Sequence, residues 1–237
     1  MTALTYDTYV TTIANLLVVP SADTNFQQML PSIINDAELR IYRDLDLLDT
    51  STLSTTTLTA GNRNLTLPSV NGTPIVTTEI NIITPVATQP DSGTRNALVP
   101  ASTEMLNFLW PSVTGSTVPQ YWAPFNQNFV LLGPWPDQAY VAEITHTIHP
   151  NQLSSTVTTT ILSVLFPDVL VAASMVFASG YLQNFGKAAD DPQMAMTWEG
   201  HYKTLLESAQ VEEARKVFTS QGWSANQPAP LATPPRT

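Results

Sequence analysis

Residues 31–49, PSIINDAELRIYRDLDLLD, decide the fold class, because the helical hydrophobic period ends in them and a different period begins directly after them. Up to Asp44 the apolar residues of this region recur every three or four positions, as they do along one face of an α-helix. These residues are Phe26, Leu30, Ile33, Ile34, Ala37 and Ile41. Three aspartates, Asp44, Asp46 and Asp49, then end the helical pattern. Such a helix fits either a catalytic site or an assembly surface.

The chain before this stretch is helical as well. A first apolar stripe at helical spacing consists of Tyr6, Tyr9, Val10, Ile13, Leu16 and Leu17. Pro20 is expected to end this helix. Thr24 is predicted to cap the second helix, with Gln27 completing a capping box. Pro31 lacks a backbone N–H, so we expect a kink or a late start of the helix there.

From Ser51 the period changes to an alternation of apolar and polar residues, which is typical of β-strands. The segments with this pattern are rich in Thr, Val and Ile: STLSTTTLTAG (51–61), NLTLP (64–68), TPIVTTEINIITP (73–85), NFVLLG (128–133) and AYVAEITHTI (139–148). A short helix is expected at STEMLNFLW (102–110), and residues 86–98 and 110–122 are interpreted as long loops.

Helical patterns return near Phe166, where Pro167 and Asp168 suit a first turn. Residues 169–182, VLVAASMVFASGYL, are almost wholly apolar. This run is shorter than the roughly 20 residues that cross a bilayer, so it predicts a buried core helix. Asp191 is expected to cap a last helix, on which Glu199 and Lys203 form an i, i+4 pair.

These patterns predict an α+β protein with an insertion. Residues 1–50 and 160–218 are predicted to form a discontinuous helical bundle. Residues 51–159 are predicted to form an inserted β-sandwich or barrel-like domain. Residues 219–237 contain many prolines and are predicted to be an extended C-terminal tail.

The composition disfavours several kinds of chemistry. Nine Lys and Arg against nineteen Asp and Glu leave a net charge of −10, which is unsuited to gripping phosphate backbones. The chain has no Cys, so disulfides and thiolate metal sites are excluded. His146 and His149 lie three residues apart on a predicted strand and should point to opposite faces. We predict no cofactor, no metal, no membrane span and no enzyme activity.

Two separated blocks carry a resemblance to a known family. The first is LPSIINDAELRIYRDL (30–45), and the second is the pattern FPD…Y…WEGHY…L that begins at Phe166. In order and spacing these blocks resemble the head-to-tail adaptor (connector) proteins of tailed bacteriophages, the group that includes tail tubular protein A of short-tailed phages. The resemblance covers about residues 5–215 and contains no catalytic signature.

The resemblance implies a structural virion protein of the head–tail junction that is assembled in the host cytoplasm. It implies a homo-oligomeric ring, usually of twelve subunits, which docks on the portal protein. Tail tube, nozzle or fibre proteins would attach to the other side. Double-stranded DNA would pass through the lumen without sequence-specific binding. Residues 31–49 are then an assembly helix, with Glu38, Arg40 and Arg43 placed to pair with a neighbouring subunit, or else exposed to solvent.

Other candidate contact residues lie outside this helix. In the tail, the candidates for contact with the portal are Trp223, Pro228, Pro230, Pro234 and Pro235. In the β region the candidate anchors are Trp110, Tyr121, Trp122 and Phe125, which could instead fill the core of a small β domain.

Two alternatives to the adaptor stay open. One is another phage tail component, of the tube or baseplate, whose β domain binds a glycan or another partner. The other is a hydrolase hidden in the β domain, whose activity would depend on Asp36, Glu38 or His146.

Overall fold

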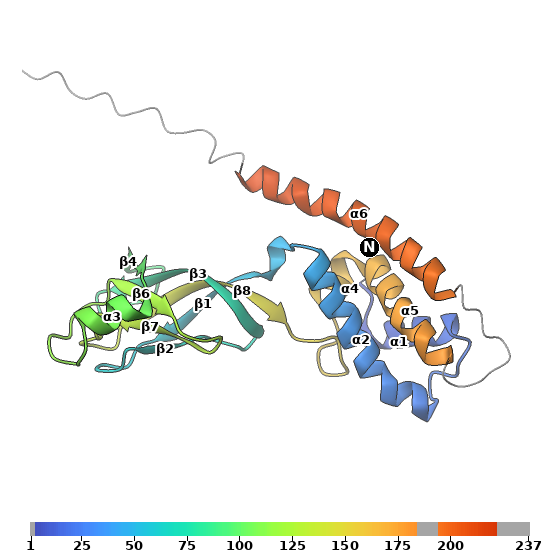
Figure 1. Cartoon of the computed structure of the whole chain (residues 1–237), viewed down its shortest axis with the longest axis horizontal. Coiled ribbons are helices and arrows are strands. Elements are labelled where there is room, and N and C mark those ends of the chain that lie inside the picture. The colour runs from blue at the N-terminus through green and yellow to red at the C-terminus, as the bar shows by residue number, and fades with distance from the viewer. Residues whose placement is uncertain (1–2, 184–193, 222–237) are drawn as a thin grey trace, which may run out of the picture. The chain divides into compact units, whose positions relative to one another are not determined.

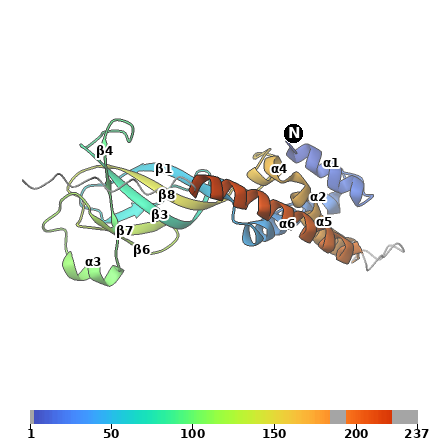
Figure 2. The same cartoon turned by 90° about the horizontal axis from the view of Figure 1, so that it is seen from above.

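The computed structural model describes residues 3–183 and 194–221 (Figures 1 and 2). The chain divides into two compact units: a helical unit, Met1–Leu48 with Gln152–Thr237, and a β unit, Asp49–Asn151. Helices at both ends of the chain thus flank an inserted segment of strands, and the predicted α+β class is confirmed.

The second helix, α2 (Thr24–Asp44), contains most of the stretch that decides the fold. Asp23 caps it, because its carboxylate oxygen accepts two backbone N–H groups of the first turn at 3.0 Å each. The prediction of Thr24 as the cap is therefore wrong by one residue. The helix also runs through Pro31, so it does not start late there.

The other helices of this unit come from both ends of the chain. They are α1 (Tyr6–Leu16), α4 (Ile161–Leu165), α5 (Pro167–Gln183) and α6 (Met194–Gln221). α5 begins at the predicted proline, and most of its apolar residues between Val169 and Ala178 are buried, as expected for a core helix. No helix within residues 3–183 and 194–221 is long and apolar enough to span a membrane. The predicted cap Asp191 lies outside the described residues.

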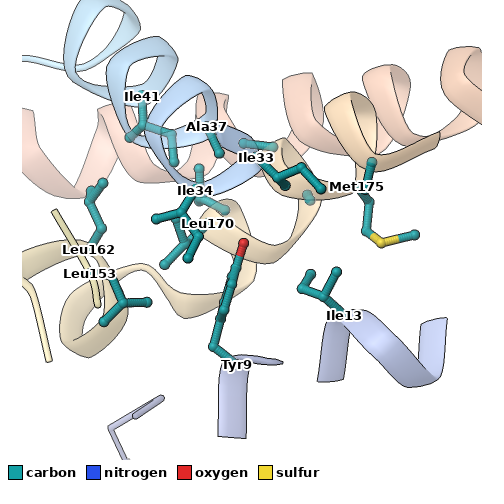
Figure 3. Close-up of a cluster of buried hydrophobic side chains, with 14 of the residues drawn as sticks. Tyr9, Ile13, Ile33, Ile34, Ala37, Ile41, Leu153, Leu162, Leu170 and Met175 are labelled. Atoms are coloured by element: carbon teal, nitrogen blue, oxygen red, sulfur yellow. The ribbon is translucent and has the colours of Figure 1, made fainter. Parts of the chain in front are cut away.

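The core of the helical unit joins α1, α2 and α5 with the last helix. All six apolar residues that define the stripe of α2 are buried in it. Figure 3 shows Tyr9 of α1 with its hydroxyl group pointing in among side chains that include Ile34 and Leu170. That hydroxyl donates a hydrogen bond of 2.7 Å to Oγ of Ser174 on α5. The core therefore holds one internal polar contact that ties the N-terminal helix to a helix 165 residues later.

The β unit contains two four-stranded sheets. The first has the order β1-β8-β3-β4, from β1 (Ser51–Thr57), β8 (Val141–Pro150), β3 (Gly72–Thr84) and β4 (Thr94–Ala97). The second has the order β2-β7-β6-β5, from β2 (Asn64–Thr66), β7 (Phe129–Gly133), β6 (Tyr121–Pro124) and β5 (Val99–Pro100). All pairs are antiparallel except β5 with β6.

The sequence did not predict β4, β5 and β6: β4 lies inside the first expected loop, β5 directly follows it, and β6 begins at the end of the second. Each has four residues or fewer, too short for an alternating pattern to stand out. The predicted short helix is confirmed as α3 (Thr103–Leu109), which Ser102 caps by accepting the N–H of Met105. The five predicted strand segments correspond to β1, β2, β3, β7 and β8.

The two sheets share one hydrophobic core and thus form a sandwich. Ile80, Ile82 and Ile144 of the first sheet pack in the same buried cluster as Val130 and Leu132 of the second. Both sheets therefore bury one face against the other, as in other packed β-sheet pairs.

The helical unit resumes at Gln152, earlier than the sequence-based boundary at residue 160. Leu153 is buried in the helical core, and the side-chain amide of Gln152 donates to the backbone oxygen of Pro31 at 2.6 Å. The segment that leads back from the β unit is thus held by α2 before α4 begins.

Candidate functional site

Glu38 lies inside the helical unit and not on its surface. Only 1% of the residue is exposed, and its Oε1 accepts the backbone N–H of Leu153 at 3.2 Å. The other carboxylate oxygen has no hydrogen-bond partner among the described residues. Burial raises the pKa of Glu38 to about 7, although the hydrogen bond from Leu153 opposes this shift. The expectation that Glu38 pairs with a neighbouring subunit is therefore corrected: its carboxyl group holds the chain segment that re-enters the helical unit.

Two tyrosines surround this buried carboxyl group. Burial raises the pKa of Tyr9 and of Tyr42, and the nearby charge of Glu38 raises both further. The environment that disfavours ionisation of the two tyrosines also disfavours a negative charge on Glu38. Below about pH 7 the arrangement therefore favours a neutral carboxyl group, enclosed within the helical unit.

Arg40 is engaged within the chain. Its guanidinium donates two hydrogen bonds of 2.7 Å to the two carboxylate oxygens of Glu199 on α6, and it lies 4.3 Å from the ring centre of Tyr202. Hydrogen bonding to Arg40 lowers the pKa of Glu199 despite partial burial. The predicted pair of Glu199 with Lys203 is also present, at 3.3 Å. Arg40 therefore joins α2 to α6 within one subunit, and its contact with a neighbouring subunit stays a prediction.

Three more polar contacts join α6 to the end of α2 and to the segment that follows it. The hydroxyl of Tyr202 donates to Asp44 at 2.8 Å, and the side-chain amide of Gln210 donates to the backbone oxygen of Asp44 at 3.2 Å. One turn further, the buried carboxylate of Glu213 accepts the backbone N–H of Leu48 at 3.2 Å. The exit of the chain toward the β unit is thus fixed by the last helix, a contact that spans 165 residues of sequence.

Arg43 is the member of the predicted trio that faces outward. Its side chain is exposed, and it makes no hydrogen bond or ion pair with the residues that the structure describes. Arg43 therefore remains a candidate for contact with another subunit.

The predicted aromatic anchors of the β unit divide into three groups. Trp122 is buried in the core of the sandwich, so its role is to fill the core. Trp110 and Tyr121 are half-buried against each other, with ring centres 5.6 Å apart, where α3 packs on the second sheet. Phe125 is 58% exposed and stacks on Phe129. Of the four predicted anchors, Phe125 is the most accessible.

The most exposed aromatic residue of this region is not among the four named candidates, although it lies two residues before Trp110. Phe108 of α3 is 84% exposed, and Met105 and Leu109 of the same helix are also exposed. Leu106, on the opposite side of the helix, packs against the second sheet. The sequence signal was the spacing of Met105, Phe108 and Leu109, which places them on one side of the helix.

The two histidines and the tail residues are the remaining candidates from the sequence. His146 is buried, which lowers its pKa, and His149 is half-buried. Within the described ranges no group of three or more His, Asp or Glu residues is placed to hold a metal ion. The tail candidates Trp223, Pro228, Pro230, Pro234 and Pro235 lie outside the described residues.

Comparison with known proteins assigns the chain to a family. Comparison with curated proteins gave no match. The SU10 adaptor protein family matches residues 4–227, which include nearly all of both units. The narrower likeness to tail tubular protein A stays a prediction. The chain therefore belongs to the SU10 adaptor protein family, and it is a structural head-to-tail adaptor of a bacteriophage.

Proposed function

We propose that this protein forms a homo-oligomeric ring, of twelve copies, that docks on the portal protein at the head–tail junction. Components of the tail tube, nozzle or fibres would bind the other side of the ring, and genomic DNA would pass through its lumen. Assembly would take place in the host cytoplasm. The observation that carries this proposal is the family match, which extends through the helical unit and the inserted β unit together.

The charges of the chain support a channel that does not hold DNA. Within the described residues, four basic side chains are already paired with carboxylates of the same chain. The pairs are Arg40 with Glu199, Arg95 with Glu143, Lys203 with Glu199 and Lys216 with Glu213. Because affinity for DNA comes from basic groups that neutralise phosphates, a chain with a net charge of −10 and such pairs would let DNA slide past.

The helical unit supports a rigid framework for docking. Its first and last helices are tied into one core, and within the same unit the buried side chains of Glu38 and Glu213 accept the backbone N–H groups of Leu153 and Leu48. In this proposal the exposed Arg43 and residues 219–237 supply contacts to other subunits and to the portal.

Imaging of assembled particles tests the proposal directly. The purified protein would be mixed with its cognate portal ring and viewed by negative-stain electron microscopy, beside a form that lacks residues 219–237. We expect an added ring at one end of the portal with the full chain, and a weakened or missing ring with the shortened chain. If neither form associates with the portal, a more distal tail component becomes the better hypothesis, and binding of glycans by the protein would then be measured.

A further inference from the structure

The helix α3 presents an apolar surface that nothing in the β unit covers. We call Met105, Phe108 and Leu109 the α3 face; they are 41%, 84% and 47% exposed. Burial of a phenylalanine side chain is strongly favourable, so the exposed Phe108 leaves a large hydrophobic free energy available for a partner. Several such residues next to one another typically mark an interaction site.

The outer side of the first sheet presents a second apolar surface. Leu53 of β1 lies opposite Thr145 of β8, and Val76 of β3 lies opposite Thr147 of β8. Ile144, which directly precedes Thr145, packs in the sandwich core, and His146, between the two threonines, is buried as well. Because side chains alternate along a strand, Thr145 and Thr147 with their partners point outward. Leu53 is 62% exposed and Val76 is 56% exposed. We call these outward residues the sheet face.

The two faces lie on opposite sides of the β unit. The first sheet packs on the second, and α3 packs on the far side of the second sheet through Leu106, Ala123 and Leu131. Figure 2 shows α3 on the side of the β unit away from β1 and β4. Two different faces on opposite sides permit a head-to-tail contact between identical copies, which is the kind of contact that closes a ring.

The charge distribution favours another copy of this chain as the occupant. Each copy carries a net charge of −10, so copies repel each other unless they meet through surfaces with little charge. Residues 98–136, which contain the α3 face, include a single charged residue, Glu104, and β1 has none. Near the sheet face, Glu79 is occupied by a hydrogen bond from Asn81, and Glu143 is paired with Arg95. Depletion of charge at the centre is typical of protein–protein interfaces.

We propose that the α3 face of one copy packs on the sheet face of the next, so that the β units form a continuous belt around the ring. Phe108 is the central anchor, and it lies against Leu53, Val76 and the threonines of β8 in the neighbouring copy. This inference rests on the proposed ring, and it names the two surfaces through which neighbouring copies meet.

Cross-linking in the assembled particle tests this contact, since the natural chain has no Cys to interfere. Two variants, Leu53→Cys and Phe108→Cys, would be mixed, assembled with the cognate portal ring and treated with a short bis-maleimide. We expect cross-linked dimers from the mixture. A chain that carries both substitutions should give a ladder of oligomers, because the two positions are on opposite sides of one copy. The matched control is Val70→Cys with Phe108→Cys; Val70 is as exposed as Phe108 but lies outside both faces.

The possible results distinguish a failure of the proposed contact from a failure of the proposed ring. A ring on the portal with Leu53–Phe108 cross-links supports the inference. A ring without these cross-links, or with equal cross-linking of the Val70 control, overturns the inference and leaves the proposed function standing. If the unsubstituted chain forms no ring on the portal, the proposed function fails and the inference with it.

A charged substitution gives a second measurement that does not depend on cross-linking geometry. Phe108→Asp would place a carboxylate in the centre of the contact, and we expect at least about a tenfold loss of ring assembly, as for other anchor residues. Val70→Asp adds the same charge elsewhere and should assemble normally. Thermal unfolding would verify that both variants fold, since both positions are exposed. Equal assembly by the two variants would contradict the role of Phe108.

Discussion

Replacement of Glu38 by Gln tests whether the buried carboxyl group makes the stability of the helical unit depend on pH. Gln has nearly the same shape and keeps an oxygen that can accept the N–H of Leu153. It cannot ionise, so it removes the pH dependence of this one site and preserves most of the contact. The variant should therefore fold, and its stability should differ from that of the natural chain mainly where Glu38 changes its protonation.

The sign and size of the effect follow from the shift in pKa. Burial raises the pKa of Glu38 from 4.5 to about 7. Between these values the unfolded chain releases a proton that the folded chain retains, so the free energy of unfolding falls as the pH rises. At about 1.4 kcal/mol for each pH unit, this site accounts for a loss of about 3 kcal/mol that is complete above pH 7. Below the unfolded pKa of 4.5 the stabilisation is fully present, because both states are then protonated.

Urea denaturation followed by circular dichroism at a helix-sensitive wavelength would measure this effect from pH 4 to pH 8. We expect the free energy of unfolding of the Gln variant to rise relative to that of the natural chain as the pH rises, by about 3 kcal/mol at pH 8. Asp36→Asn is the matched control, since it removes an exposed carboxylate from the same helix and should follow the natural chain. If the difference between Glu38→Gln and the natural chain stays constant across this range, Glu38 ionises alike in both states, and the assignment to a dry interior fails.

Two further substitutions test the other buried contacts. Arg40→Ala should destabilise the helical unit by about 1–2 kcal/mol, because it removes two charge-assisted hydrogen bonds to Glu199, whereas the exposed Arg43→Ala should change stability by less than about 0.5 kcal/mol in the same urea titration. Trp122→Ala should cost the β unit about 3–5 kcal/mol in thermal unfolding, because it leaves a cavity between the sheets; Phe125→Ala, at an exposed site, should cost much less, and similar losses for the two would refute the placement of Trp122 in the core.

The helical part of the fold was readable from local periodicity. A stripe at every third or fourth residue can be buried only if the segment is a helix, and the six stripe residues of α2 are all buried. The apolar run of α5 indicated a core helix in the same way. The alternation in β1, β3 and β8 revealed the longer strands, while β5, with only two residues, exists because its backbone pairs with β6.

The positions of the candidate site residues were less predictable, although the helical spacing of Glu38 indicated that it is buried. Glu38 lies four residues after Ile34 and three before Ile41, so its spacing already placed it on the buried side of α2. Charge alone had suggested a surface position. Phe108 was likewise identifiable as outward once Leu106 was taken as the inward residue of α3.

The sequence alone thus determined the order of helices and strands, the inserted β segment and the acidic, charge-poor character of the protein, because these depend on neighbours along the chain. Only the tertiary structure decided which groups meet. Arg40 finds Glu199 after 159 residues and Glu213 finds Leu48 after 165, and two sheets share one core. No local pattern encodes such partners, since burial and pairing depend on the packing of the whole unit.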